Sequence, residues 1–285
     1  MKKVVMTPNP YRDRNFKYAN QAARILKEAG VESKTCLAFD VDRNFEMPSD
    51  IVLHDLQQEL RDAELLICFG GDGTILHASK AATRVGIPVL GVNIGTMGFM
   101  AELESSELSE LSRLATDQYT VDERMMLHVK AVHEGQVVLE DDALNDAVIT
   151  KGAVARTIQL SVRCDNTEMM SFGGDGVVIS TPTGSTAYSM SAGGPIVEPS
   201  AQNIVITPIC AHDILTKTVV ASSQRKITVE IGRIGRKNAF LSVDGGRALR
   251  LYTGDTITIT KSRYVTKLIH LSDRSFFDIV KNKLK

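Results

Sequence analysis

Apolar residues recur in two different patterns along this chain, and the two patterns predict two domains. In residues 1 to 105, short apolar runs that are typical of buried strands alternate with segments whose apolar residues recur at helical spacing. Residues 119 to 270 instead contain short β-type runs that are separated by turn residues. We therefore expect an α/β domain over residues 1–105 and a β-rich domain over residues 106–270.

The predicted elements of the α/β domain follow one another as strand, helix and strand, which is typical of an open parallel sheet. The expected strands are residues 4–6, 34–39, 65–69 and 88–92, and the expected helices are residues 19–30, 51–61 and 75–85. Further along the chain we expect a helix at 106–115, a hairpin turn at 133–136, strands at 143–149 and 177–180, and a C-terminal helix at 274–284.

The strand at residues 65–69 leads into a glycine-rich turn, Gly-Gly-Asp-Gly-Thr, at residues 70–74. In a parallel sheet such a turn lies at the carboxyl end of the strands, where backbone amides and the dipole of the next helix favour a bound phosphate. Thr74 is the expected N-cap of that helix. The motif alone is consistent with a tight turn. A carboxylate among phosphate-binding amides, however, repels the ligand unless it coordinates a metal or accepts a proton, so Asp72 indicates chemistry.

Three further stretches carry candidate ligand-binding residues. The loop at residues 93–99 is also glycine-rich and ends in Phe99, which either packs in the core or stacks on a purine. Asn145 and Asp146 interrupt an apolar run, so they either satisfy local backbone groups or face a ligand. Hydroxyl groups are more numerous than helix capping needs, and suit a sugar or purine, at residues 183, 185, 186, 188, 189 and 191.

Composition excludes several classes of protein. The formal net charge is -1, aromatic residues make up 5% of the chain and Trp is absent, which argues against a nucleic-acid partner. The four cysteines form no C-x-x-C pair, so we expect buried free thiols rather than a zinc or redox site. No apolar run approaches the ~20 residues of a membrane span, and residues 1–6 are too short for a signal peptide. We therefore expect a cytoplasmic protein without a membrane partner.

The glycine-rich turn resembles the signature shared by NAD kinases and by diacylglycerol and sphingosine kinases, with a related loop in phosphofructokinases. Residues 172–195 resemble the second NAD kinase signature, which the lipid kinases lack. The loop at 93–99 and the Asn145-Asp146 pair are similar to further NAD kinase motifs. The chain departs from this family at Thr96-Met97, in the sequence around His212, and at Gly173, where many relatives have Arg.

The resemblance implies a phosphofructokinase- or diacylglycerol-kinase-like open sheet, a C-terminal β-sandwich, and a C-terminal segment, residues 271–285, that returns to the first domain. It implies an NAD kinase that moves the γ-phosphoryl group of ATP, or a phosphoryl group of polyphosphate, onto the 2′-hydroxyl of the adenosine ribose of NAD. Mg²⁺ or another divalent cation would be held mainly by the donor phosphates, and the protein would be a homo-oligomer, a tetramer. A lipid kinase and a non-catalytic dinucleotide sensor remain the alternatives.

The site residues divide into three groups. Asp72 is the expected catalytic base. The expected phosphate-binding residues are Gly70, Gly71, Gly73 and Thr74. The resemblance implies that NAD is bound by Asp72, Gly73, His77, Phe99, Asn145, Asp146, Arg156, Gly173, Asp175, Thr183, Thr186, Ala187, Tyr188, Ser189, Met190, Ser191 and Asp244.

Overall fold

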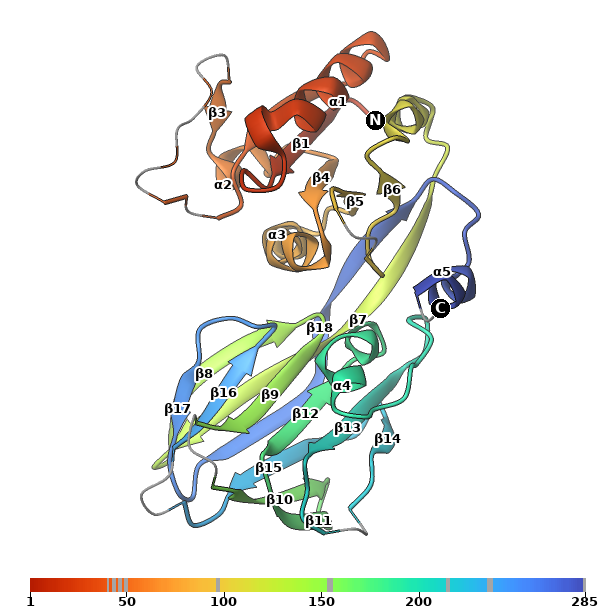
Figure 1. Ribbon diagram of the computed structural model, residues 1–285. Coiled ribbons are helices and arrows are strands. Elements are labelled where there is room, and N and C mark those ends of the chain that lie inside the picture. Colours follow the sequence, from red (N-terminus) through yellow and green to blue (C-terminus); the bar gives the residue numbers. More distant parts are fainter. Residues whose placement is uncertain are drawn as a thin grey trace. The chain divides into compact units, whose positions relative to one another are not determined.

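The computed structural model describes residues 1–39, 41, 42, 45, 48, 51–95, 98–152, 156–213, 216–234 and 238–283. The chain forms two compact units (Figure 1). The first unit comprises residues 1–123 and 266–285, and the second unit comprises residues 124–265. Two strands, β7 (Thr120–His133) and β18 (Thr256–His270), contain residues of both units.

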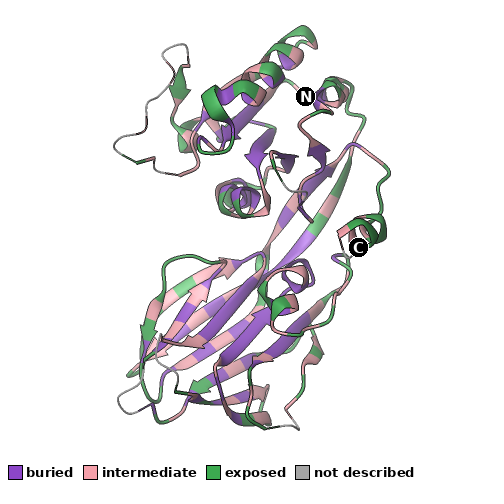
Figure 2. Ribbon diagram, viewed as in Figure 1, coloured by how far each residue is buried: buried purple, intermediate pink, exposed green. Residues whose placement is uncertain are grey.

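The first unit contains a parallel sheet with the strand order β3-β2-β1-β4-β5. The bounds are β1 (Lys3–Pro8), β2 (Glu32–Cys36), β3 (Leu53–His54), β4 (Leu65–Gly70) and β5 (Val89–Asn93). Two further parallel partners of β5 are β6 (Leu103–Glu104) and the end of β18. Every residue of β4 and β5 is buried, as expected of central strands that are covered on both faces (Figure 2).

The helices of the first unit complete its core. They are η1 (Arg14–Phe16), α1 (Lys17–Glu28), α2 (Leu56–Glu59), α3 (Asp72–Val85), η2 (Leu108–Thr116) and α5 (Phe276–Lys283). Leu108, Leu111 and Leu114 of η2 lie in the same hydrophobic cluster as α1 and β4, so the compact unit extends past the boundary expected at residue 105. Among the helices of the described residues, none is long and apolar enough to span a bilayer.

Several helix predictions were wrong in detail. Residues 51–61 form β3 followed by the short α2, because Asp55 caps that helix by accepting a hydrogen bond from the amide of Gln58 at 2.8 Å. The segment expected as a helix at 106–115 forms the 3-10 helix η2. The C-terminal helix is confirmed as α5, while Leu284 lies outside the described residues.

The second unit is β-rich and contains two sheets. One sheet runs in the order β11-β10-β15-β18, with β7 beside β18 and β8 beside β7, and the other in the order β14-β13-β12-β9-β16-β17. Side chains from both sheets form one hydrophobic cluster. The remaining bounds are β8 (Gln136–Ala143), β9 (Asp146–Lys151), β10 (Ile158–Cys164), β11 (Thr167–Gly174), β12 (Gly176–Ser180), η3 (Thr183–Thr186), α4 (Tyr188–Ser191), β13 (Asn203–Ile209), β14 (Val219–Ser222), β15 (Ile227–Ile231), β16 (Ala239–Val243) and β17 (Leu249–Leu251).

The structure confirms the hairpin between β7 and β8, in which His133 pairs with Gln136. The strand expected at 143–149 was wrong at its start, because β8 ends at Ala143 and β9 begins at Asp146. Cys36 and Cys68 are buried thiols, and desolvation raises the pKa of each to about 12. The expectation of burial was wrong for Cys210, which is exposed.

Candidate functional site

The glycine-rich turn joins β4 to α3. Strand β4 ends at Gly70, Gly71 is the residue before the helix, and α3 begins at Asp72. The prediction that Thr74 caps α3 was wrong, because Thr74 lies inside the helix and its amide donates to the carbonyl of Gly71 at 2.9 Å. Its hydroxyl accepts a hydrogen bond from Asn9 Nδ2 at 3.0 Å. A Cβ atom at Gly70 would lie 2.3 Å from that hydroxyl oxygen, so only glycine fits there.

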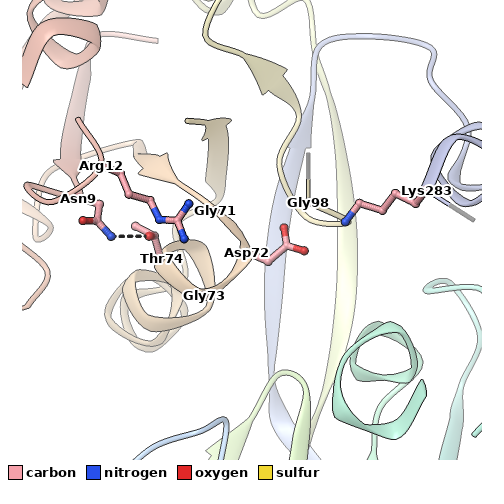
Figure 3. Close-up of a pocket in the computed structure, with 8 residues that line it drawn as sticks. All are labelled: Asn9, Arg12, Gly71, Asp72, Gly73, Thr74, Gly98 and Lys283. Carbon is pink, nitrogen blue, oxygen red and sulfur yellow. Dashed lines mark hydrogen bonds between the residues drawn. The ribbon is translucent and has the colours of Figure 1, made fainter. Parts of the chain in front are cut away.

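A pocket of about 460 Å³ lies at this turn, and all of its lining residues belong to the first unit (Figure 3). The turn contributes residues 71–74, and Gly98 comes from the loop after β5. Asn9 and Arg12 come from the loop after β1, while Lys283 comes from the last turn of α5. Figure 3 shows Arg12 and Lys283 on two sides of Asp72. Two cations and the positive end of the α3 dipole surround one carboxylate, which favours a bound anion.

The carboxylate of Asp72 is held by the backbone of the neighbouring loop. Its Oδ2 accepts a hydrogen bond from the amide of Phe99 at 2.7 Å, and its Oδ1 accepts one from the amide of Met100 at 3.0 Å. The approach is so close that a Cβ atom at Gly98 would lie 1.8 Å from Oδ1. The two hydrogen bonds fix the side chain, and each carboxylate oxygen keeps capacity for a further proton or ligand.

Phe99 is partly buried and touches the C-terminal helix. Its ring centroid lies 6.5 Å from that of Phe276, and the ammonium of Lys283 lies 4.1 Å from it. Earlier in the same loop, Asn93 donates to Glu104 Oε2 at 2.8 Å, and its buried Oδ1 has no partner among the described residues. Thr96 and Met97, the departure from the family pattern, lie outside the described residues.

In the second unit, Asp244 organises the Asn145-Asp146 pair. Its carboxylate accepts hydrogen bonds from the amides of Leu144 at 2.8 Å, Asn145 at 2.8 Å and Asp146 at 3.2 Å. The backbone here is therefore satisfied by Asp244, and the side chain of Asn145 keeps a buried Oδ1 without a partner in the described part of the chain. An unpaired buried acceptor is costly, so this atom favours a ligand that donates a hydrogen bond.

The hydroxyl-rich segment packs on the same pair. A Cβ atom at Gly184 would lie 2.1 Å from the carbonyl oxygen of Asn145, so the segment approaches it backbone to backbone. Two of these hydroxyls are used within the protein: those of Ser185 and Ser189 are buried and bonded to Pro182 O at 2.6 Å and to Thr207 Oγ1 at 3.0 Å. The exposed hydroxyls are those of Tyr188 and Ser191.

Other expected residues have partners within the protein. Asp175 forms an ion pair with Lys151 at 2.8 Å, and Thr186 donates to the carbonyl of Thr183 at 3.1 Å. His77 is not among the lining residues of the pocket, and Nε2 of its imidazole lies 2.9 Å from the carbonyl oxygen of Ala38. Arg156 is exposed in the second unit, just before β10.

Comparison with known proteins gives the family of this chain. The family model of the ATP-NAD kinase N-terminal domain matches residues 4–119, and that of the ATP-NAD kinase C-terminal domain matches residues 144–271. An NAD kinase from Ruminiclostridium cellulolyticum is 34% identical over 285 residues, which cover 100% of this chain and 98% of that protein. An NAD kinase from Acetivibrio thermocellus is 36% identical, with 100% and 97% covered. The chain belongs to the NAD kinase family.

Two solved structures with a similar fold are also kinases of NAD or NADH. The fold is similar to that of a yeast NADH kinase complexed with NADH, with a TM-score of 0.85 and 25% identity over 100% of this chain and 87% of that chain. It is also similar to the fold of an NAD kinase from Archaeoglobus fulgidus in complex with ATP, with a TM-score of 0.75, 24% identity, and 100% and 98% covered. The two-domain NAD kinase fold, α/β first and β-rich second, is therefore the fold of this chain.

The NAD kinase motifs did not point to three residues of the pocket. Asn9 follows β1 directly, and the carboxyl ends of β1 and β4 meet at one edge of the sheet because the two strands are parallel neighbours. This register would have been the signal for Asn9 and Arg12. No such signal exists for Lys283, since it lies more than 200 residues after the glycine-rich turn along the chain.

The first prediction concerns pH. Burial, together with the charge of Asp244, raises the pKa of Asp146 from its usual 3.8 to about 7. The folded state then binds the proton more tightly than the unfolded state, so stability is lost as the pH rises through about 7. Asp146→Asn removes the titration. Relative to wild type, the variant should gain about 3 kcal/mol of stability between pH 5 and pH 8, because about two of the roughly three pH units between 3.8 and about 7 lie in that range.

Thermal unfolding of wild type and Asp146→Asn at both pH values measures this effect. We expect the unfolding midpoint of the variant, relative to wild type, to be several degrees higher at pH 8 than at pH 5. An equal difference between the two proteins at both pH values would contradict the prediction.

Proposed function

We propose that this protein is an NAD kinase that transfers the γ-phosphoryl group of ATP to the 2′-hydroxyl of the adenosine ribose of NAD, which gives NADP. The observation that carries the proposal is the fixed carboxylate of Asp72 inside a cationic pocket. A pocket built only to bind phosphate gains nothing from an acid at its centre. Membership of the NAD kinase family supports the same substrates.

Asp72 would accept the proton of the attacking hydroxyl at one carboxylate oxygen. Phosphoryl transfer passes through a loose transition state, so most of the catalysis comes from in-line positioning and from cations on the phosphates. The amides of Gly71 and Gly73, together with Arg12, suit the phosphate groups, and Thr74 retains its hydroxyl hydrogen as a further donor. No lysine of a Walker motif is required.

A divalent cation such as Mg²⁺ would be held mainly by the donor phosphates and would neutralise their charge. The described residues contain no group of three or more His, Cys, Asp or Glu side chains that could hold a metal ion alone. The donor set of the pocket, one carboxylate and one hydroxyl, therefore fits a cation that takes most of its ligands from the phosphates.

The dinucleotide would be bound by residues of the NAD kinase motifs. The unpaired Oδ1 of Asn145 suits an amino group such as that of adenine, and Asp146 with its raised pKa can donate or accept a hydrogen bond. Phe99 supplies an aromatic face for a base, and Tyr188 and Ser191 supply exposed hydroxyls. We propose supporting roles for Gly70, His77, Arg156, Gly173, Asp175, Thr183, Thr186, Ala187, Ser189, Met190 and Asp244.

A coupled assay for NADP formation from NAD, ATP and Mg²⁺ tests the function. We expect turnover that requires all three components. A lipid kinase would give no NADP but would phosphorylate diacylglycerol, and a sensor would bind NAD without product. Replacing ATP with inorganic polyphosphate in the same assay decides between the two donors.

The second prediction concerns NADH. Gly173 occupies the position where many relatives carry Arg, so a fixed cation is missing, and we expect NADH and NAD to react with kcat/KM values within about 10-fold of each other. The fold similarity to a yeast NADH kinase supports this expectation. A Cβ atom at Gly173 would lie 2.7 Å from Nε2 of Gln159 on the neighbouring strand, and the flexible end of that side chain can move.

Gly173→Arg should therefore fold and shift the NAD to NADH ratio of kcat/KM. Gln159→Ala is the matched control, since it makes space at the same place without adding charge. A wild-type enzyme strongly selective for NAD, or a ratio that Gly173→Arg leaves unchanged, would contradict the prediction.

We also propose that the active protein is a homo-oligomer, a tetramer. Strand β8 pairs only with β7 among the described strands, and its Val137 and Val138 are 49% and 44% exposed. Exposed apolar edges of this kind are usually covered. Light scattering at micromolar concentration should give the mass of four chains, and a monomer with full activity would contradict this.

A further inference from the structure

Helix α5 lies against the pocket although apolar burial does not hold it there. None of its described residues is buried. Its contacts with the loop of Phe99 are the ring of Phe276 and the ammonium of Lys283, which also lines the pocket. Burial in the hydrophobic core therefore does not explain why the helix lies there.

A buried carboxylate anchors the segment that leads into α5. Glu102, which is 6% exposed, accepts hydrogen bonds from the amides of Leu271 at 2.9 Å and Ser272 at 2.7 Å, and from Ser272 Oγ at 2.7 Å. Nδ1 of His270 lies 2.8 Å from the other oxygen. Burial acts to raise the pKa of Glu102, but the hydrogen bonds from His270 and Ser272 lower it, so the anchor is charged at neutral pH. Polar contacts thus set the position of α5.

The pocket that α5 borders has an excess of positive charge. Arg12 and Lys283 are its two cations and Asp72 is its one carboxylate. Within the part of the chain that the structure describes, neither cation forms an ion pair. The positive end of the α3 dipole lies at the same place. Unpaired cations beside a helix N-terminus suit a polyphosphate, which carries several negative charges.

The present partner of Lys283 is weak. Its ammonium lies 4.1 Å from the centroid of the Phe99 ring, and a cation–π contact at a partly exposed site is weaker than a charge-assisted hydrogen bond to a phosphate oxygen. The four-carbon stem of lysine lets the ammonium reorient without movement of the helix. A phosphate in the pocket would therefore draw Lys283 away from the ring.

We propose that Lys283 binds the phosphate groups of the donor nucleotide, and that Phe99 holds its ammonium beside the pocket until the donor arrives. The inference rests on the proposed function, which supplies a nucleoside triphosphate as the donor. Glu102 is then a positioning residue, because it acts on the donor only through the placement of α5.

Calorimetry of ATP and of inorganic tripolyphosphate binding to the full chain, with Mg²⁺ and without NAD, tests the proposal. Lys283→Met keeps the aliphatic stem over Phe99 and removes the charge. We expect the Kd for both ligands, and the KM for ATP, to rise about 10-fold or more, while the KM for NAD changes less than twofold. Lys283→Arg, which keeps the charge, should recover most of the affinity. Lys281→Met is the matched control, since it removes a charge from an exposed position on the same helix.

Three results would overturn the proposal. One is unchanged affinity for ATP and tripolyphosphate in Lys283→Met. Another is an equal loss of affinity in Lys281→Met, which would indicate that any positive charge on α5 attracts the phosphates and that Lys283 makes no specific contact. The third is a lower unfolding temperature with equal losses for ATP and NAD, which would make Lys283 a structural contact of α5. A wild-type protein that forms no NADP contradicts the proposed function instead, and the calorimetry distinguishes the two failures because it needs no turnover.

Discussion

Asp72→Asn should lower kcat for NADP formation by about 10²- to 10⁴-fold and change the affinity for NAD by no more than a few-fold. Asparagine keeps the shape of the side chain and loses its basicity. A base that accepts the proton of the ribose hydroxyl acts during transfer, so its loss appears in kcat and not in ground-state binding. Turnover within twofold of wild type would remove Asp72 from this role.

Asp72→Asn also changes the hydrogen bonds that hold the side chain. Both carboxylate oxygens accept backbone amides, from Phe99 and Met100. Asparagine has only one acceptor oxygen, so it can accept a hydrogen bond from only one of these two amides. Its Nδ2 group faces the other amide, which is also a donor. That amide loses its hydrogen-bond partner, at a cost of about 1–3 kcal/mol in stability. Asp72→Ala removes both partners and serves as the comparison. If Asp72 is the base, both variants lack it, so kcat should fall by a similar factor in Asp72→Asn and Asp72→Ala. A purely structural role predicts a larger loss of kcat in Asp72→Ala.

Local patterns in the sequence predicted the first unit well, because a parallel sheet has a strong signature. The all-apolar run at residues 65–69 became β4, buried over its whole length, and the turn after it has the position expected for a phosphate site. Asp72 could be singled out from chemistry alone, since its charge conflicts with its neighbours. Family motifs then supplied the expected residues of the second unit.

The failures occurred where tertiary contacts decide the outcome. Thr74 is a residue type that often caps helices, but Gly71 adopts the extended backbone that precedes the helix, and the Thr74 hydroxyl accepts a hydrogen bond from Asn9 instead. Ser189 is used to bond Thr207, eighteen residues away along the chain, and no local pattern indicates that partner. Lys283 lines the pocket at the end of a returning segment that Glu102 binds through the amides of Leu271 and Ser272, and no local pattern indicates these contacts. Each of these depends on long-range geometry that a single sequence does not encode locally.

Gly98→Ala should lower kcat by about 10²-fold although it changes no group that contacts the reacting atoms, because a displacement of about 1 Å can cost that much. A Cβ atom at this position would lie 1.8 Å from Oδ1 of Asp72 and 2.4 Å from its Cγ. Asp72 is the first residue of α3 and its side chain is short, so the helix cannot absorb the overlap. Either the carboxylate rotates away from the amides of Phe99 and Met100 or the loop moves, and in both cases the base is misplaced.

Gly73→Ala is the matched control for this variant. Gly73 also lines the pocket, but a Cβ atom there meets nothing within 4 Å, so Asp72 stays in place. Because Gly73 faces the phosphate-binding space, its substitution should raise the KM for ATP and leave kcat within a few-fold of wild type. The two glycine variants are therefore expected to affect different kinetic constants.

The double variant Asp72→Asn with Gly98→Ala separates a positioning role of Gly98 from an independent one. If Gly98 acts only by leaving room for the carboxylate, its substitution should cost little once the carboxylate is gone, and the two effects should be far from additive. We expect kcat of the double variant within about threefold of that of Asp72→Asn, since residues in direct contact that act as a unit share one loss. A further 10²-fold loss in the double variant, equal to that of Gly98→Ala alone, would show that the glycine acts independently of Asp72 and would contradict the geometry on which the proposed base depends.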